Sequence, residues 1–212
     1  MGHPSSPRLL VLHTLRLKGV AEAEAIASDV GLAPEVVDGE LSALEVADLV
    51  RVRRGRIGGY ALTPAGKTLD ERLIAEELAE AGVRPVVEAA YGDFLEFNGQ
   101  LLAVCTAWQL REVDGETHIN DHSDPEHDRA VHDRLEALHE RVVPVLDALT
   151  GALDRFAGHG DRLGTALAHV RAGDHDWFTK PMFPSYHSVW FELHEDLLAT
   201  LGTERATESE IL

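Results

Sequence analysis

Histidine is the residue type with the most obvious chemical use in this sequence, and its distribution is uneven. Ten of the twelve histidines lie between His118 and His194. Because an imidazole titrates near neutral pH and binds transition metals, this density indicates acid–base chemistry or a metal site. The segment HINDHSDPEH adds aspartate oxygens, and its candidate metal ligands are His118, His122 and His127. It contains no HExxH or other compact zinc motif, so the alternative is a solvated helix start with histidines as ordinary polar residues.

A second set of side chains fits a small-molecule pocket. In SYHSVWFELHEDLL, His187, Phe191 and His194 share one stripe of a helix beside an apolar stripe. Imidazole and aromatic groups together can line a pocket for an aromatic or anionic ligand. Polar residues on the core side of the preceding long helix also need partners, and a ligand is one such partner. The alternative is hydrogen bonding within a helical core. The candidate ligand-binding residues are Tyr91, Asn98, Trp108, Gln109, Trp177, His187, Trp190 and His194.

Basic residues gather at one place in the chain. Arg51, Arg53, Arg54 and Arg56 lie within six residues, around three glycines. A cationic ribbon of this kind is suited to contact with the DNA backbone or insertion into the minor groove. The alternative is that these arginines pair with acidic helices beside them.

The net charge of −18 is also unevenly placed. Residues 1–68 contain eight basic and eight acidic residues, so the whole net charge belongs to residues 69–212. The second part of the chain should therefore repel a polyanion, and only the first part can dock on one.

The elements expected to position the arginines form a helix-turn-helix pattern followed by a hairpin. Helices are expected over residues 7–18, 21–31 and 33–48, the third with buried Val37, Leu41 and Leu44. Residues 49–53 and 60–62 alternate as short strands do. Thr63 and Pro64 are then the N-cap and first residue of another helix.

The order of these elements, with VxxxLxxL in the third helix and LTPAGK after the hairpin, resembles the winged-helix domain of MarR- or PadR-type transcription regulators. The resemblance covers about residues 7–72. It implies that the third helix faces the major groove and that the hairpin is the wing. Asp38 and Gly39 replace the Ser, Thr, Arg, Gln or Asn usual just after the buried valine. The implied DNA-binding residues are Ser42, Arg51, Arg53, Arg54 and Arg56.

The remainder of the sequence predicts helices. A long helix is expected over residues 84–112, a loop over 113–124, and a further helix from Ser123 or Asp124 that Pro144 should kink or divide. A shorter helix follows over 160–173, then an aromatic loop and a last helix over 185–202. The predicted fold class is mostly α, with an N-terminal winged helix-turn-helix and a two-stranded wing followed by an α-helical domain. The predicted domains are residues 7–80 and an acidic ligand-binding and dimerisation domain, residues 84–202.

The function expected from these features is ligand-responsive, DNA-binding transcription regulation. The expected partners are double-stranded DNA, a small-molecule effector and a second copy of the chain. The alternatives are an enzyme or metalloprotein that uses the His, Asp and Trp residues of the helical domain, and a protein-interaction module. No nucleophile elbow, phosphate loop or paired-carboxylate motif is present, so the sequence names no reaction class, catalytic residue or cofactor other than a metal ion. With a single cysteine, no long apolar run and no export signal, a cytoplasmic protein without membrane contact is expected.

Overall fold

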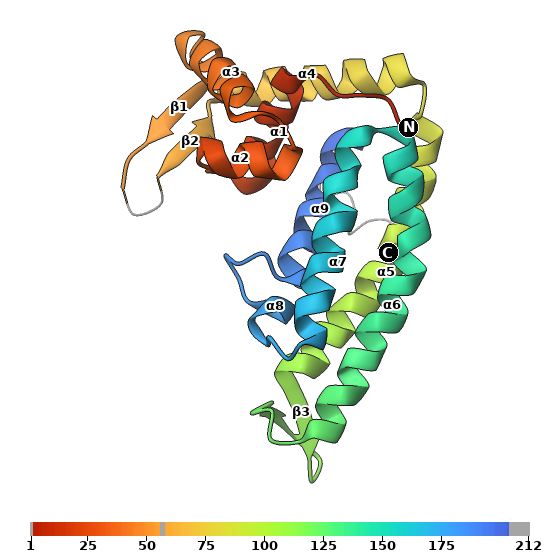
Figure 1. Ribbon diagram of the computed structural model, residues 1–212. Helices are drawn as coiled ribbons and strands as arrows, with labels where there is room; N and C mark the ends of the chain where they lie inside the picture. Colours follow the sequence, from red (N-terminus) through yellow and green to blue (C-terminus); the bar gives the residue numbers. More distant parts are fainter. Residues whose placement is uncertain (1, 56–57, 204–212) are drawn as a thin grey trace.

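The computed structural model describes residues 2–55 and 58–203, and these are mostly helical (Figure 1). Four helices and a hairpin, residues 7–81, form an N-terminal unit at one end of the molecule. Long helices of the second part, residues 84–201, run side by side away from it. We call these regions the N-terminal unit and the helical part. No helix within the described residues is long and apolar enough to cross a membrane.

The N-terminal unit begins with three short helices, as the sequence predicts. They are α1 (Pro7–Lys18), α2 (Ala23–Val30) and α3 (Pro34–Val46). The Ser6 side chain accepts a hydrogen bond from the Leu9 amide and starts α1, and Gly31 ends α2 in a left-handed conformation. The predicted stripe of Val37, Leu41 and Leu44 is buried, so α3 packs with that face inward.

The hairpin of the N-terminal unit is held at its base by the chain that precedes α2. Strands β1 (Val50–Arg53) and β2 (Gly59–Leu62) pair antiparallel. Tyr60 also exchanges two backbone hydrogen bonds with Ala21, of 2.8 and 3.1 Å. At Gly59, φ is +128° and an added Cβ would lie 2.5 Å from the Ala21 carbonyl oxygen, so this close approach requires glycine. The hairpin is thus attached to the chain just before α2, and β2 leads through Thr63 into α4.

Helix α4 (Pro64–Ala81) connects the two regions. Its N-cap is Thr63, whose hydroxyl accepts from the Gly66 amide, and Pro64 occupies the first turn as predicted. In Figure 1, α4 crosses the top of the helical part before the chain turns into α5. Leu9, Ile74 and Ala199 form a small apolar cluster where α1, α4 and α9 meet. The segment before α1 contributes a further contact, because His3 pairs with Leu153.

The helical part is built around two long helices, α5 (Arg84–Gln109) and α6 (Pro125–Ala152), which pack along their lengths. A 3-10 turn, η1 (Asp154–Phe156), leads to α7 (Ala157–Arg171), and α9 (Tyr186–Leu201) packs between α5 and α7. The helix α6 starts at the predicted N-cap Asp124, whose carboxylate accepts from two backbone amides. Asp176–Thr179 form the one-turn helix α8 within the predicted aromatic loop.

Two expectations about the helical part are wrong. The long helix ends at Gln109, not Glu112, and residues 110–119 are a hairpin of β3 (Leu110–Val113) and β4 (Glu116–Ile119) instead of helix end and loop. Asp114 and Gly115 both have positive φ, the two-residue turn that Asp-Gly favours.

Of the two effects expected of Pro144, division of the helix is wrong, because α6 continues as one helix of 28 residues. Proline within a helix removes a hydrogen bond at a cost of about 3 kcal/mol. Val142, Val145 and Leu146 next to it are buried in the core, so their packing outweighs that cost.

Candidate functional site

The hairpin β1–β2 presents its arginines to solvent. Val50 is the buried residue of β1, whereas Arg51, Arg53 and Arg54 are exposed. Within the part of the chain that the structure describes, none of these three arginine side chains forms a hydrogen bond or ion pair. The described structure therefore gives no support to the alternative that Arg51, Arg53 and Arg54 form ion pairs with acidic helices. Arg56, the fourth predicted residue, lies outside the described residues.

Helix α3 presents a different surface beside the hairpin. Ser42 is exposed, as its predicted role requires, but Glu35, Asp38 and Glu45 are exposed on the same helix. Glu40 pairs with Arg8 of α1, with 2.9 Å between the guanidinium Nε and the carboxylate. The protein therefore neutralises one carboxylate of α3 and leaves the others facing solvent.

The eight candidate ligand-binding residues do not meet in one place. Tyr91, Asn98, Trp190 and His194 do come together, between α5 and α9. The Trp190 indole donates a 3.0 Å hydrogen bond to Asn98 Oδ1, and Phe94 stacks on Trp190 with centroids 4.6 Å apart. Since Trp190 and His194 are only 3% and 6% exposed, this group forms part of the core. Its geometry matches the alternative of satisfied polar residues within a helical core.

The other four candidates lie elsewhere in the helical part. Trp108 stacks on Phe178 with centroids 4.5 Å apart, and the Gln109 amide lies 3.4 Å from the Thr179 hydroxyl. Trp177 stacks on His169 at 3.9 Å. His187 is half-buried on α9, and burial lowers its pKa. The eight candidates are thus divided among separate groups, one between α5 and α9 and the others around α8 and on α9.

The candidate metal ligands have separate partners as well. His118 is exposed on β4, the His122 Nδ1 atom lies 3.0 Å from Asp128, and the His127 Nε2 atom lies 2.8 Å from the Ala107 carbonyl oxygen. Among the residues that the structure describes, no three His, Cys, Asp or Glu side chains are placed to hold a metal ion. His122 instead packs on Trp108 together with two other imidazoles, those of His132 and His175.

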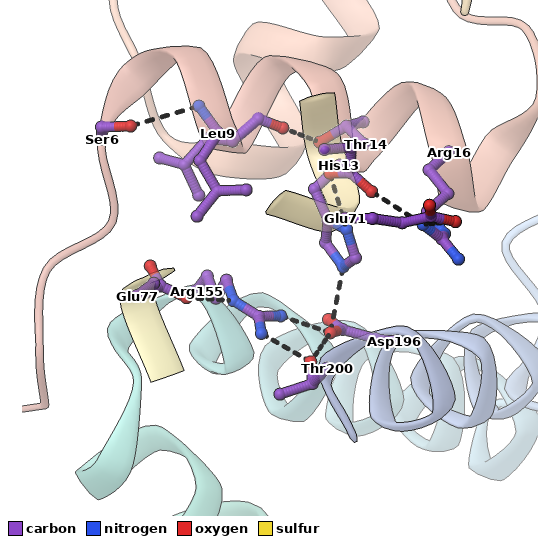
Figure 2. Close-up of polar contacts among 12 residues, drawn as sticks. Ser6, Leu9, His13, Thr14, Arg16, Glu71, Glu77, Arg155, Asp196 and Thr200 are labelled. Carbon is purple, nitrogen blue, oxygen red and sulfur yellow. Dashed lines mark hydrogen bonds and ion pairs between the residues drawn. The ribbon is translucent and has the colours of Figure 1, made fainter. Parts of the chain in front are cut away.

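Within the described residues, a dense set of buried charged side chains includes none of the predicted site residues. It lies where α1 and α4 meet α9, η1 and α7, and Figure 2 shows most of its contacts. We call it the junction network; its members are His13, Asp70, Glu77, Arg155, His159, Asp196 and Thr200, all buried.

Arg155 is the centre of the junction network. Its Nε atom donates a 2.9 Å hydrogen bond to Glu77 of α4, and its two Nη atoms donate to Asp196 and Thr200 of α9 (Figure 2). His159 Nε2 lies 2.8 Å from the second oxygen of Asp196. A single guanidinium therefore joins the N-terminal unit to the last helix, in the forked geometry that arginine provides.

His13 makes a parallel connection from α1. Its Nδ1 atom lies 3.3 Å from Asp70 Oδ1, and its Nε2 atom lies 3.0 Å from Asp196 Oδ1. Asp70 also accepts a 3.2 Å hydrogen bond from Arg16. His13 is 4% exposed, and the two carboxylates are 0% and 2% exposed, so solvent screens these contacts little.

The electrostatics of the junction network favour charged groups despite burial. Burial alone would raise the pKa of Asp196, but Arg155 and His13 beside it hold that pKa well below its usual range. Burial alone would lower the pKa of His13, but the Asp196 and Asp70 carboxylates outweigh it and raise the pKa. A cavity of about 50 Å³, lined in part by His13, His159 and Arg162, adjoins the network, and this volume corresponds to one or two water molecules.

One signal in the sequence points toward these residues. His13 interrupts the apolar run LLVLHTL, and Asp196 interrupts the apolar final helix. A polar residue on an apolar stripe must be satisfied inside the protein. The partners could not be named, because they are separated by tens to hundreds of positions in the chain.

Comparison with protein families, with curated proteins and with solved structures found no match to this chain. Its function is therefore inferred from its own residues and their arrangement.

Proposed function

We propose that this protein is a ligand-responsive transcription regulator that binds double-stranded DNA through a winged-helix unit. The observation that carries the proposal is the exposed hairpin on which Arg51, Arg53 and Arg54 have no partner in the described chain. Elsewhere the chain carries a strong negative charge, so an unpaired cationic hairpin is suited to a polyanion.

The arrangement around the hairpin supports a winged-helix interpretation. The order of α1, α2, α3, β1, β2 and α4 is that expected from the resemblance to MarR- and PadR-type regulators. The pairing of Ala21 with Tyr60 fixes the hairpin beside the helix-turn-helix, so wing and recognition helix can approach one DNA duplex together.

In this proposal the wing supplies most of the DNA affinity. The carboxylates of α3 oppose close approach to phosphates, and Ser42 is the uncharged polar group on its exposed face. Arginines on a short ribbon can contact phosphates or enter the minor groove without the helix lying deep in the major groove. Binding is therefore proposed to depend on DNA shape and backbone more than on base edges.

The proposed regulator acts as a homodimer, and its effector is a small molecule. Among the described residues, a groove of about 590 Å³ lies between α4 and the last turns of α9. This volume is in the range of small-molecule sites. Arg16, Lys67 and Arg84 contribute to its walls, which belong to both regions of the molecule. A ligand in this groove would contact the N-terminal unit and the helical part at once, as coupling between effector and DNA requires.

The test is DNA binding by the variant R51Q/R53Q/R54Q, measured at low salt on a duplex from upstream of the protein's own gene. Three lost charge-assisted contacts of about 1 kcal/mol each would weaken binding on the order of 100-fold. The matched control is R129Q/R134Q, because these arginines of α6 are also exposed and without an ion pair in the described chain. The proposal fails if the natural chain does not bind at low salt, or if the control loses as much affinity as the wing variant.

A further inference from the structure

The charge balance of the junction network depends on its imidazoles. Three buried carboxylates, Asp70, Glu77 and Asp196, face two guanidinium groups, Arg155 and the partly exposed Arg16, which Glu71 also shares. His159 contacts Asp196 alone, whereas His13 contacts both Asp70 and Asp196, so a proton on His13 supplies positive charge between two buried carboxylates. A buried carboxylate without compensation is among the costliest arrangements in a protein interior.

The positions of the two imidazole nitrogens of His13 give an independent reason for protonation. Each nitrogen faces a different carboxylate, Asp70 on one side and Asp196 on the other. These contacts are ion pairs and not aligned hydrogen bonds, because neither ring nitrogen of His13 has a hydrogen-bond partner in the described chain. A neutral imidazole carries no net charge and turns a lone pair toward one of the carboxylates, whereas the imidazolium attracts both carboxylates through its charge. The geometry therefore favours the charged form of His13.

The two carboxylates that His13 joins belong to different regions of the molecule. Asp70 is on α4 of the N-terminal unit, and Asp196 is on α9 of the helical part. We call His13 with these two carboxylates the His13 bridge. The charged groups facing it from the other packed elements are Arg16 on α1, Arg155 on η1 and His159 on α7. Around them lie Lys18, Asp29, Arg162 and Glu192, which pair with one another.

We propose that the His13 bridge is a proton-dependent connection that fixes the orientation of the N-terminal unit on the helical part. With the proton bound, His13 holds Asp70 and Asp196 together. When the proton leaves, His13 no longer attracts both carboxylates, and the unit is held by Arg155, by the Leu9–Ile74–Ala199 cluster and by the pairing of His3 with Leu153. Because neighbouring carboxylates raise the pKa of His13 in the folded chain, the bridge is complete below the ordinary histidine value of about 6.5. It is lost as the pH rises through the raised value.

The first experiment needs no change in the junction. Spin labels are attached to A43C on α3 and A137C on α6, both exposed positions on opposite sides of the junction. The natural Cys105 is buried, and burial raises its pKa to about 12, so it stays unlabelled. We expect one narrow distance distribution below pH 6.5 and a broader or shifted one at higher pH. The midpoint should equal that of the His13 ring signal in an NMR titration.

Variants of the junction then test whether the pH midpoint of the label distance arises from the His13 bridge. D70N removes one carboxylate beside His13 and should move both midpoints to lower pH. H13Q should abolish the pH dependence of the distance. The control H118Q changes an exposed histidine outside the junction and should leave both midpoints unchanged. If H13Q does not fold, the pH dependence of the label distance in the chain with the natural junction and in D70N still tests the His13 bridge.

Two outcomes would overturn the inference. In one, the His13 signal titrates while the distance distribution stays constant. In the other, His13 titrates no higher than His118. The role of the bridge in regulation rests on the proposed function, so DNA affinity is measured separately at each pH. Absence of DNA binding at every pH would contradict the proposed function, while the label distances would still report on the bridge.

Discussion

At the scale of single residues, Arg155 is the side chain on which most of the junction depends. It is buried, and it donates to Glu77 on α4 and to Asp196 and Thr200 on α9. A buried ion pair adds little when it replaces apolar contacts, but removal of one partner leaves an uncompensated charge. Arg155 is therefore expected to matter far more for stability than the many exposed ion pairs of this chain.

We expect R155M to lower the free energy of unfolding by about 3 to 5 kcal/mol, because two buried carboxylates lose their common cation. The matched control is R171M, which breaks the exposed pair of Arg171 with Glu136 and should change stability by less than about 1 kcal/mol. Urea denaturation followed by circular dichroism measures both. Equal losses in the two variants would show that the junction network contributes no more than a surface pair.

The stability of the folded chain should also depend on pH at both ends of the range. The raised pKa of His13 gives stability that is present below about pH 6.5 and disappears as the pH rises through the raised value. The lowered pKa of Asp196 gives stability that is present above its unfolded value of about 3.9 and disappears as the pH falls. Urea midpoints from pH 2 to 9 measure this profile. H13Q should flatten its alkaline side, and an unchanged alkaline slope in that variant would contradict the assignment.

At the scale of elements, α4 is the piece that joins the hairpin to the junction. Its first turn packs against the residue before β1, and its later turns carry Asp70 and Glu77. Gly66 makes that packing close, since an added Cβ would lie 2.0 Å from the Leu49 carbonyl oxygen. Helix α4 can therefore transmit a change at the junction to the base of the hairpin.

A pair of glycine variants tests this close contact. G66A should destabilise the protein by about 1 to 3 kcal/mol, because backbone atoms of Leu49 must move. G99A lies in the middle of α5 with open space around the added Cβ, so it should gain up to about 1 kcal/mol from helix propensity. Thermal unfolding compares the two. A neutral G66A would mean that α4 is not held against Leu49 in solution.

At the scale of the whole molecule, charge separation determines which end of the protein could approach DNA in the proposed function. The net charge of −18 belongs to residues 69–212, and the exposed arginines lie on a hairpin at the other end (Figure 1). The helical part should repel DNA, so a complex can form only with the N-terminal unit directed toward the duplex. The same repulsion should weaken any contact between DNA and parts of the protein other than the hairpin.

This arrangement predicts how DNA affinity changes with salt. With about 0.9 counterions released per phosphate contact, the three described wing arginines correspond to a slope near −3 per protomer in log K against log salt. Fluorescence anisotropy between 50 and 200 mM salt measures the slope. R51Q/R53Q/R54Q should reduce its magnitude by about 3 per protomer, whereas R129Q/R134Q should leave it unchanged. A steep slope that survives in the wing variant would place the DNA contacts elsewhere.

The sequence by itself determined the features that depend on neighbouring residues. Thr63 with Pro64 and Asp124 with Pro125 start helices where capping chemistry requires them, and the arginines of β1 are exposed on a strand next to glycines. Even the hairpin β3–β4 had a local signal, Asp114 with Gly115, although the helical pattern of the preceding residues obscured it. These features were accessible because backbone propensity and side-chain spacing act over a few residues.

Only the tertiary structure decided which polar side chains meet. Tyr91, Asn98, Trp190 and His194 pack together in the core, whereas the other candidate ligand residues are elsewhere. His13 acquires its charge partners from α4 and α9, far away in the chain. The composition around a buried histidine does not reveal its protonation, because that depends on which carboxylates the fold places beside it. The exposed arginines of the β1–β2 hairpin could be predicted from the sequence, and the partners that meet in the junction network could not.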